Sequence, residues 1–356
     1  MTERSGSPRS GVRLPLAAAG VLLVGACTAL PTSAASAGSA APVTAGSAAA
    51  GATELCRITD ARLHELSGLV VVGDRLLAVN DGGDSLAVQV LDTGCRVVEE
   101  RSSPVDPYDP EDLALAADGT VWIADVGDNR RERATVALLA LRPDGSTAVH
   151  RLSYPDGPHD AEALLLAPDG TPYLVTKDPL GASGVYRPEA ALVDGGTVGL
   201  TRVAAVTLTV TGTPGGPVGT SGQLMVTGGA VSGDGRLLAL RTYTDAYVWP
   251  LSGSDVPGAL DGTPVRVPLP ASPQGEAVSF AADDRQLVVA GEGLPAEVLV
   301  VPTEAALEPI AEALTAAGPD AGTFGDGGRS PLLSGAIAVL VATVVLWLAG
   351  LRRRRD

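Results

Sequence analysis

The sequence lacks the short motifs that identify common catalytic machineries. It contains no G-x-S-x-G nucleophile elbow, no H-E-x-x-H zinc helix, no G-x-x-x-x-G-K-[ST] phosphate loop and no C-x-x-C redox pair. These absences exclude the usual serine-hydrolase, zinc-peptidase, P-loop and thioredoxin-like assignments by motif. The function therefore has to be inferred from the repeats of the chain, its charge and the positions of its acids.

Positive charge is scarce, and lysine is nearly absent. The chain has 25 Lys and Arg residues against 41 Asp and Glu residues, and Lys177 is its only lysine. The first 34 residues contribute +2 and the last 26 contribute +3 to the total charge of −16, so residues 35–330 carry −21. Nucleic-acid phosphates need clustered basic residues, so this composition argues against a nucleic-acid partner. It is compatible with a bound divalent cation.

The two ends of the chain predict an exported, membrane-anchored protein. Residues 1–34 contain three arginines, then an apolar stretch, then small residues, which is the order of a cleaved secretory signal. Lipidation at Cys27 is the alternative, because residues 23–27 resemble a lipoprotein box. Residues 331–351 are uncharged and long enough to span a bilayer, and residues 352–356 form a basic tail. We therefore expect a single-pass protein of the cell membrane with an extracytoplasmic body and a cytoplasmic C-terminus.

Cysteine is rare, with three residues in the whole chain. Cys27 lies in the predicted signal, which leaves Cys56 and Cys95 as an even pair in an oxidising compartment. We therefore predict a Cys56–Cys95 disulfide. The segments that flank the body are of low complexity: residues 35–54 predict a flexible spacer, and residues 304–330 predict a membrane-proximal linker.

Helical periodicity is rare between these segments, and a repeat takes its place. Five segments each contain an apolar run, a turn with Asp or Asp-Gly, and a second apolar run, which is the pattern of a β-hairpin. Further strand-like runs follow the hairpins, so a typical unit holds four predicted strands. The five segments are residues 65–84, 110–129, 160–179, 226–245 and 275–293.

Four-stranded units that recur in this way predict an all-β fold, a five-bladed β-propeller over residues 55–303. The last unit lacks a fourth strand, and we expect residues 55–61 to supply it and to close the ring. The spacing of 65 residues between Asp169 and Asp234 leaves a six-bladed alternative, with a short extra blade around residues 186–224. One C-terminal transmembrane helix completes the predicted architecture.

The repeat also gathers acidic residues at one edge of the predicted ring. In an antiparallel hairpin, the start of the first strand and the end of the second lie at the same edge, so the residues farthest from the turns meet at one mouth of the central channel. Converging carboxylates repel one another, and a bound Ca²⁺ or other divalent cation would relieve that repulsion. The aligned positions at the start of the first strands are Ser67, Glu111, Glu162, Thr227 and Glu276.

Candidate roles follow from the residue types at this edge. Cationic side chains can stabilise developing negative charge, and a histidine or carboxylate can act as a base. The predicted catalytic residues are Glu111, Glu162, Glu276, Lys177, Arg241 and His159. The predicted metal ligands are Asn80, Asp81, Asp125, Asp128 and Asn129.

Structural explanations compete with each of these roles. The aligned glutamates could be exposed acids at blade edges, and residues 125–129 could form a loop that Asx turns shape without any ligand. His159 could be an ordinary surface residue. A functional site is favoured by repetition, because three separate units place a glutamate at one aligned position.

Several short motifs resemble those of bacterial extracytoplasmic phytase-like or esterase-like β-propeller proteins. The resemblance covers roughly residues 55–302. It implies a propeller with an acidic, calcium-binding channel mouth, although this chain has no clear phytase signature. Gluconolactonase-type propellers look similar in placing Glu, Asn and Asp around one divalent metal. The motifs are Glu65–Leu69, Asn80–Asp84, Pro110–Leu113, Asp125–Asn129, His159–Ala163 and Gln274–Ala277.

Two functions stay open at this point. The first is an extracytoplasmic, metal-dependent hydrolase of an ester, lactone or phosphoester, with a small anionic or ester substrate. The second is a non-catalytic binding or scaffold propeller that meets a partner in the cell envelope, because a fold does not fix a function. No motif in the sequence separates the two.

Overall fold

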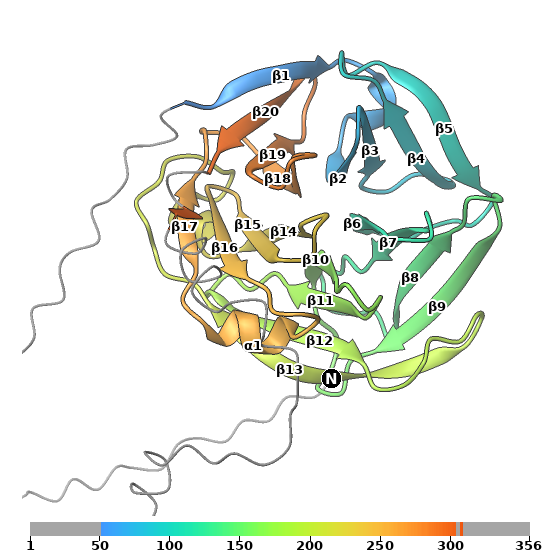
Figure 1. Cartoon of the computed structure of the whole chain (residues 1–356). Coiled ribbons are helices and arrows are strands. Elements are labelled where there is room, and N and C mark those ends of the chain that lie inside the picture. The colour runs from blue at the N-terminus through green and yellow to red at the C-terminus, as the bar shows by residue number, and fades with distance from the viewer. Residues whose placement is uncertain (1–50, 304–306, 309–356) are drawn as a thin grey trace, which may run out of the picture. The chain divides into compact units, whose positions relative to one another are not determined.

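The computed structural model of the chain describes residues 51–303 together with residues 307 and 308. These residues form an all-β, propeller-like fold whose strands are grouped around a centre (Figure 1). The predicted signal, most of the spacer and linker, the predicted transmembrane helix and the basic tail lie outside the described residues. The helices within residues 51–303 are all too short or too polar to cross a bilayer.

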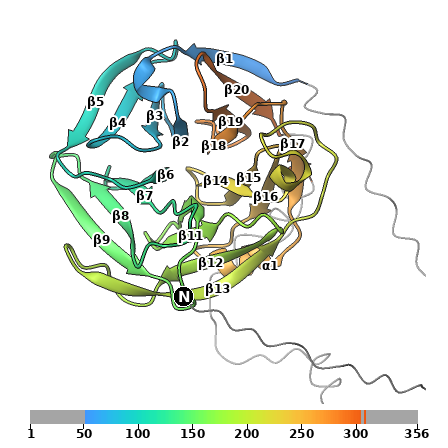
Figure 2. The same ribbon diagram turned by 180° about the vertical axis from the view of Figure 1, so that it is seen from behind.

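The described strands pair into five four-stranded antiparallel units (Figures 1 and 2). The first unit is β2 (Leu66–Val72), β3 (Arg75–Asn80), β4 (Leu86–Leu91) and β5 (Val97–Ser103). The second is β6 (Pro110–Leu115), β7 (Val121–Asp125), β8 (Val136–Leu141) and β9 (Thr147–Ser153). The third is β10 (Ala161–Leu166), β11 (Pro172–Thr176), β12 (Ala182–Pro188) and β13 (Thr197–Thr207).

The remaining two units have the same strand order. The fourth is β14 (Val226–Val231), β15 (Leu237–Thr242), β16 (Asp245–Pro250) and β17 (Val265–Pro268). The fifth is β18 (Gly275–Phe280), β19 (Gln286–Gly291), β20 (Ala296–Pro302) and β1 (Thr53–Ile58). Three short helices connect strands: η1 (Ala61–Leu63), η2 (Gly219–Gln223) and α1 (Val256–Asp261).

The N-terminal strand supplies the outermost position of the last unit, as the sequence predicted. Strand β1 pairs antiparallel with β20, and it begins at Thr53, two residues inside the predicted spacer. The predicted disulfide is also confirmed: Cys56 on β1 is bonded to Cys95 in the turn before β5, with their Cα atoms 5.6 Å apart. The two ends of the repeat are therefore joined both by backbone hydrogen bonds and by a covalent bond.

The long spacing within the repeat is filled without a further sheet. Between Tyr186 and Leu224 the structure has the eleven-residue strand β13, which pairs with β12 and, in parallel, with β9, followed by an irregular segment that ends in η2. The irregular segment contains residues 211–222, TGTPGGPVGTSG, whose two prolines and five glycines are poor strand formers. The parallel contact of β13 with β9 joins the second and third units into one eight-stranded sheet.

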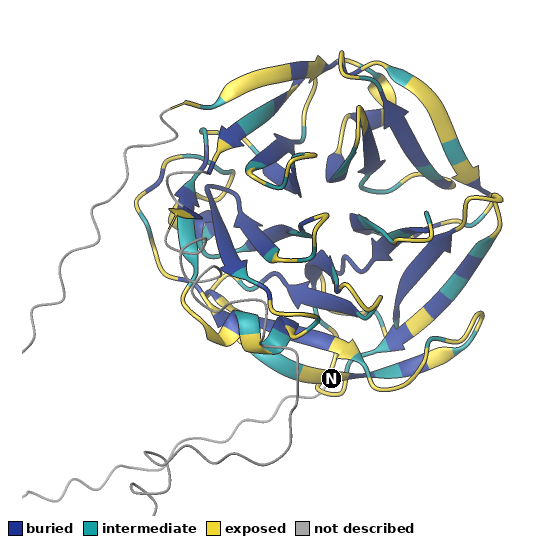
Figure 3. Ribbon diagram, in the orientation of Figure 1, coloured by how far each residue is buried: buried dark blue, intermediate teal, exposed yellow. Residues whose placement is uncertain are grey.

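The turns and the core follow the predicted hairpin pattern. Gly119, Gly170 and Gly235 have φ angles of 85°, 84° and 69°, the left-handed conformation that tight turns require. Apolar side chains of neighbouring units pack against each other; Leu77 of the first unit and Ile123 of the second, for example, belong to one cluster. The first strands are buried, while the outermost strands carry most of the exposed positions (Figure 3).

Candidate functional site

Each of the five first strands has a β-bulge at its start. The pairing register shifts between Leu66 and Gly68, and equivalent shifts occur in the four other first strands. A bulge leaves a residue unpaired and re-aims its side chain. The residues that fall inside the bulges are the aligned ones, Ser67, Glu111, Glu162, Thr227 and Glu276. All five are buried, so the three glutamates are not exposed edge acids.

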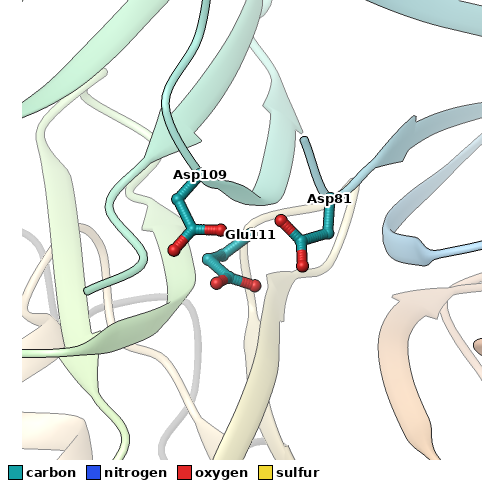
Figure 4. A group of neighbouring side chains, drawn as sticks. All are labelled: Asp81, Asp109 and Glu111. Atoms are coloured by element: carbon teal, nitrogen blue, oxygen red, sulfur yellow. The ribbon is translucent and has the colours of Figure 1, made fainter. Parts of the chain in front are cut away.

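Three carboxylates converge at the first two units. Asp81 follows β3, Asp109 precedes β6, and Glu111 is the second residue of β6. One carboxylate oxygen from each lies within 4.8 Å of the others, and the three side chains point toward one another (Figure 4). We call these residues the carboxylate trio. A second group of the same kind, formed by Glu111, Asp160 and Glu162, shares Glu111 with the trio.

Glycine at position 127 is required for this convergence. A Cβ atom placed on Gly127 would collide with the carboxylates of Glu111 and Asp109. The backbone N–H of the same glycine donates to the carbonyl of Asp109 at 3.1 Å. The central residue of the Asp125–Asn129 motif, Gly127, therefore contributes to the site because its backbone lies close to two carboxylates of the trio.

The trio carries more negative charge than its environment stabilises. Burial and the carboxylate of Asp81 raise the pKa of Asp109 to about 7. Burial, together with the charges of Glu162, Asp81 and Asp109, raises the pKa of Glu111 well above its ordinary value. Glu111 is buried, whereas Asp81 and Asp109 are half-buried. Because like charges this close together disfavour full ionisation, protons or a cation would stabilise the trio at neutral pH.

The only lysine of the chain contacts the second carboxylate group. Lys177 Nζ donates to Glu162 Oε1 at 2.6 Å and lies 5.3 Å from the centre of the Tyr243 ring. Burial raises the pKa of Glu162 to about 7 although Lys177 opposes the rise. Glu276 Oε2 is buried without a hydrogen-bond partner, and burial and Glu162 raise the pKa of Glu276 well above its ordinary value.

Arg241, predicted to stabilise negative charge, is fully buried beneath this region. Its Nη1 donates to the carbonyl of Ala277 at 2.7 Å and to that of Ala290 at 2.9 Å. The guanidinium of Arg241 therefore links β18 and β19 by hydrogen bonds to a carbonyl of each strand. Burial lowers the pKa of Arg241 to about 10.

The predicted ligands after β7 serve mainly to shape their loop. Asp125 accepts from Arg133 Nη2 at 2.9 Å and from the backbone N–H of Asp109 at 2.9 Å. Asp128 accepts from the backbone N–H groups of Glu132 and Arg133 at 3.0 and 2.8 Å. These contacts match the alternative in which Asx turns form the loop, and the third predicted ligand of this loop, Asn129, is exposed.

Asn80 and His159 lie next to site residues and contact other groups. Asn80 accepts from the backbone N–H of Glu65 at 2.8 Å and donates to the carbonyl of Asp81 at 2.9 Å, so it positions Asp81. A ring nitrogen of His159 lies 2.9 Å from Asp156 Oδ1 and 3.1 Å from the hydroxyl of Tyr186. Of the five predicted metal ligands, Asp81 is the one that the structure brings into the trio.

Two acids of the site were expected at the channel mouth but were not among the predicted catalytic residues or metal ligands. Asp109 and Asp160 each precede an aligned glutamate by two residues. Two residues is the side-chain period of a strand, so the repeated Asp-x-Glu spacing was a usable signal for a shared face. Asp160 also accepts from the backbone N–H of Asp128 at 2.8 Å, which ties the loop after β7 to the third unit.

Asp112 was also missed, and it holds three first strands together. Its carboxylate accepts from the backbone N–H groups of Leu113, Leu164 and Gly229 at 2.8, 2.8 and 3.1 Å, in β6, β10 and β14. Burial raises the pKa of Asp112 to about 8 against the effect of these donors. Because its partners are 52 and 117 residues away, no local pattern identifies this role.

No family model and no curated protein sequence matches the chain. Among solved structures, it is similar to a gluconolactonase from Xanthomonas campestris, at 19% identity and a TM-score of 0.40, over 67% of this chain and 72% of that chain. It is similar to a putative gluconolactonase at 17% identity and a TM-score of 0.40, over 67% and 74% of the two chains. It is also similar to a glutaminyl cyclase from Myxococcus xanthus, at 12% identity and a TM-score of 0.40, over 70% and 95%. Similarities at this level assign no activity.

Proposed function

We propose that this chain is a membrane-anchored, extracytoplasmic hydrolase that uses a divalent metal ion to cleave an uncharged ester or lactone. We take its five four-stranded units as the blades of a five-bladed propeller. The observation that carries the proposal is the carboxylate trio, Asp81, Asp109 and Glu111, whose oxygens lie within 4.8 Å of one another. A bound cation relieves the repulsion among converging carboxylates at neutral pH, as retained protons also do.

The donor set of the trio fits a hard divalent ion. All three donors are carboxylate oxygens, and Ca²⁺ takes about 6 to 8 oxygen ligands. Three protein ligands leave positions for water and for a substrate oxygen. An ion bound there would polarise the substrate carbonyl and lower the pKa of a water molecule beside it.

Glu162 is the best-placed base for the attacking water. It belongs to the carboxylate group that shares Glu111 with the trio, and its pKa of about 7 is suited to proton transfer near neutral pH. The water oxygen bonds to the carbonyl carbon while its proton passes to Glu162. The same proton then goes to the leaving alkoxide as the C–O bond breaks. Lys177, at 2.6 Å, holds the Glu162 carboxylate in place during both steps.

The cations near the site favour an uncharged substrate over a phosphoester. A phosphate group needs several free basic residues. Lys177 is paired with Glu162, Arg133 is paired with Asp125, and Arg241 donates to backbone carbonyls. An anionic substrate would meet an acidic site whose nearest cations are already engaged, and a neutral ester or lactone would not.

The proposed location outside the cytoplasm rests on the sequence and on one structural feature. Disulfides form in oxidising compartments, and the described part of the chain contains Cys56–Cys95. The signal at residues 1–34 and the span at residues 331–351 would anchor the body at the outer face of the cell membrane.

Metal analysis and a substrate panel test the proposal. The purified full-length chain would be analysed for bound metal and assayed on aryl esters, lactones and phosphoesters, with calcium and with a chelator. We expect one bound divalent ion per chain and chelator-sensitive turnover on esters or lactones. Absence of turnover on all three classes in the metal-loaded protein would overturn the assignment. Calcium-insensitive turnover that survives Glu111→Gln would do the same.

The alternative is a cell-surface binding or scaffold module. The Lys177–Glu162 pair at 2.6 Å favours it, because this contact neutralises one of the converging acids without a metal. In that case the protein would contain no stoichiometric metal, and Glu111→Gln would leave the capture of its envelope partner unchanged. Cross-linking on intact cells, with the wild-type chain and this variant in parallel, separates the two functions.

A further inference from the structure

A cavity of about 440 Å³ opens between the fourth and fifth units, next to the candidate site. Its walls come from the loop before β18, residues 270–273, and from β19, β20 and the loop between them, within residues 289–299. Nine of its fifteen lining residues are proline, alanine, valine or leucine. The volume falls in the range of small-molecule pockets, about 300 to 1,000 Å³. We call this cavity the apolar groove.

Hydrogen bonds place one end of the apolar groove at the candidate site. Glu292 lines the groove, and its backbone N–H donates to the carbonyl of Gln274, two residues before Glu276, at 2.9 Å. The backbone N–H of Gly293, the next lining residue, donates to the carbonyl of His64 at 3.0 Å, which joins this loop to the first unit. Arg241 also lines the groove, and its Nη1 donates to the carbonyl of Ala277, the residue after Glu276. The groove therefore borders the segment that carries Glu276.

The chemistry of the apolar groove differs from that of the other cavity found beside the site. The cavity at the first unit, of about 290 Å³, is lined by Arg62, His64, Gln89 and Glu100 among others. Most of the residues that line the apolar groove are prolines or have aliphatic side chains. One of them, Leu294, is 37% exposed. A groove with aliphatic side chains and a few polar groups suits a ligand with an apolar part and a polar part.

We propose that the apolar groove binds an aliphatic acyl or alkyl chain of the substrate while the ester or lactone carbonyl lies at the carboxylate trio. The identity of the reacting group rests on the proposed function. The assignment of an aliphatic chain to the substrate rests on the groove alone. It makes the substrate an amphiphile. The polar lining residues are Arg241, Ser272, Glu292 and Glu297, and the other lining side chains are aliphatic or absent. A charged or hydroxylated group placed against the aliphatic side chains would lose hydration there.

A photoreactive probe tests the apolar groove without requiring catalysis. An octanamide with a terminal diazirine is not an ester, so its binding does not depend on turnover by the proposed reaction. After irradiation of the full-length chain, we expect the label within residues 51–303 to fall on the segments 270–273 and 289–299. Ala271→Trp would fill the groove and Leu294→Asp would charge it. Both positions are exposed, so folding should tolerate them, and we expect each variant to reduce this labelling at least fivefold.

Controls distinguish the apolar groove from exposed apolar residues in general. Leu180→Asp changes a leucine that is 85% exposed in the loop after β11, at the same edge as the site. It should leave labelling of the groove unchanged. A label found elsewhere in residues 51–303, or equal loss with Leu180→Asp, would overturn the proposal.

Chain-length kinetics give the second measurement. For p-nitrophenyl acetate, butyrate, hexanoate and octanoate, kcat/KM should rise by up to about fourfold per buried methylene. Leu294→Asp should flatten the series, whereas Leu180→Asp, outside the groove, should leave the series and the acetate rate unchanged. Turnover that is independent of chain length would overturn the groove and keep the hydrolase. If the groove is labelled but the protein hydrolyses no ester or lactone, the proposed groove ligand stands and the proposed hydrolase activity is overturned.

Discussion

Two sites in this molecule, the carboxylate trio and the buried carboxylate of Asp245, differ in what surrounds their acids. Asp245, at the start of β16, is fully buried and accepts from the hydroxyls of Thr211, Thr213 and Thr244 at 2.8, 2.8 and 2.7 Å and from Arg266 at 2.6 Å. We call this the anchor cluster, because it fastens the irregular segment before β14 to the fourth unit. In the carboxylate trio, each acid has the oxygens of two other acids within 4.8 Å.

This difference in hydrogen-bond donors distinguishes an acid that stabilises the fold from acids that could bind a cation or transfer a proton. A buried charge is stable when donors satisfy it, and the anchor cluster gives Asp245 four of them. The trio has no comparable set of donors, and Ser67, which donates to Glu111 Oε2 at 3.0 Å, is the exception. Burial alone therefore does not distinguish the two sites. They differ in their neighbours, because Asp245 is surrounded by hydrogen-bond donors and the acids of the trio have other carboxylates nearby.

Glu111→Gln should produce the largest effect on function. The change preserves the shape of the side chain and removes its charge, so a metal ion would lose one of its three charged ligands and bind more weakly. Metal polarisation contributes several kcal/mol and each 1.36 kcal/mol is a factor of ten, so we expect kcat/KM to fall about a thousandfold. Elemental analysis should show loss of the bound ion in the same protein.

The matched control is Asp245→Asn in the anchor cluster. It removes a buried charge of the same sign from a site that has its own donors. Metal content and kcat/KM should stay at the wild-type level in the folded fraction. Equal loss of activity in both variants would mean that the two clusters do not differ in function.

Asp245→Ala should produce the largest effect on stability. It leaves the guanidinium of Arg266 and three hydroxyls without their shared acceptor, and the loss of a buried charged partner costs about 3 kcal/mol. Urea unfolding, followed by circular dichroism in the presence of a chelator, measures the change. Glu111→Gln should instead keep or raise the free energy of unfolding, because it relieves repulsion. A comparable drop in both variants would contradict the distinction.

The stability of the metal-free protein should fall as pH rises from 5 to 8. Asp109 and Glu162 have pKa values of about 7 in the folded chain, and Asp112 has one of about 8, all chiefly because of burial. An acid with a raised folded-state pKa binds more protons when folded than when unfolded, so the free energy of unfolding decreases with pH between the two values. Asp109→Asn should flatten the slope. Added calcium should oppose the decline most strongly at pH 8, and a stability that rises across this range in chelator would contradict the prediction.

The repeat, the closing strand and the disulfide were predictable because their signals are local or covalent. Asp-Gly turns and alternating apolar runs identify hairpins, and their alignment placed Glu111, Glu162 and Glu276 at one position. That position proved to be a bulge in every first strand, which the alignment detected only as a recurring residue.

The partners of charged residues were not predictable in this way. Arg241 was assigned from its type, yet its acceptors are the carbonyls of Ala277 and Ala290, 36 and 49 residues away. Asp125 was predicted to be a metal ligand, yet its Oδ1 lies 2.9 Å from Nη2 of Arg133 in an ion pair. Whether a charge is free or engaged depends on tertiary contacts, and the residue type at an aligned position does not contain that information.

Asn129→Ala should produce the smallest effect, and it tests whether residue type or geometry defines the site. Asn129 has the side chain expected of a metal ligand and follows the same strand as Asp125, but it is exposed. Surface substitutions away from special features change stability by less than about 0.5 kcal/mol, and we expect that result here, with unchanged metal content. Asp109→Asn, at a position that residue type alone did not select, should remove the metal. If the two outcomes were reversed, the ion would be bound by the loop after β7, and the donor-poor trio would then be held by shared protons instead of a cation.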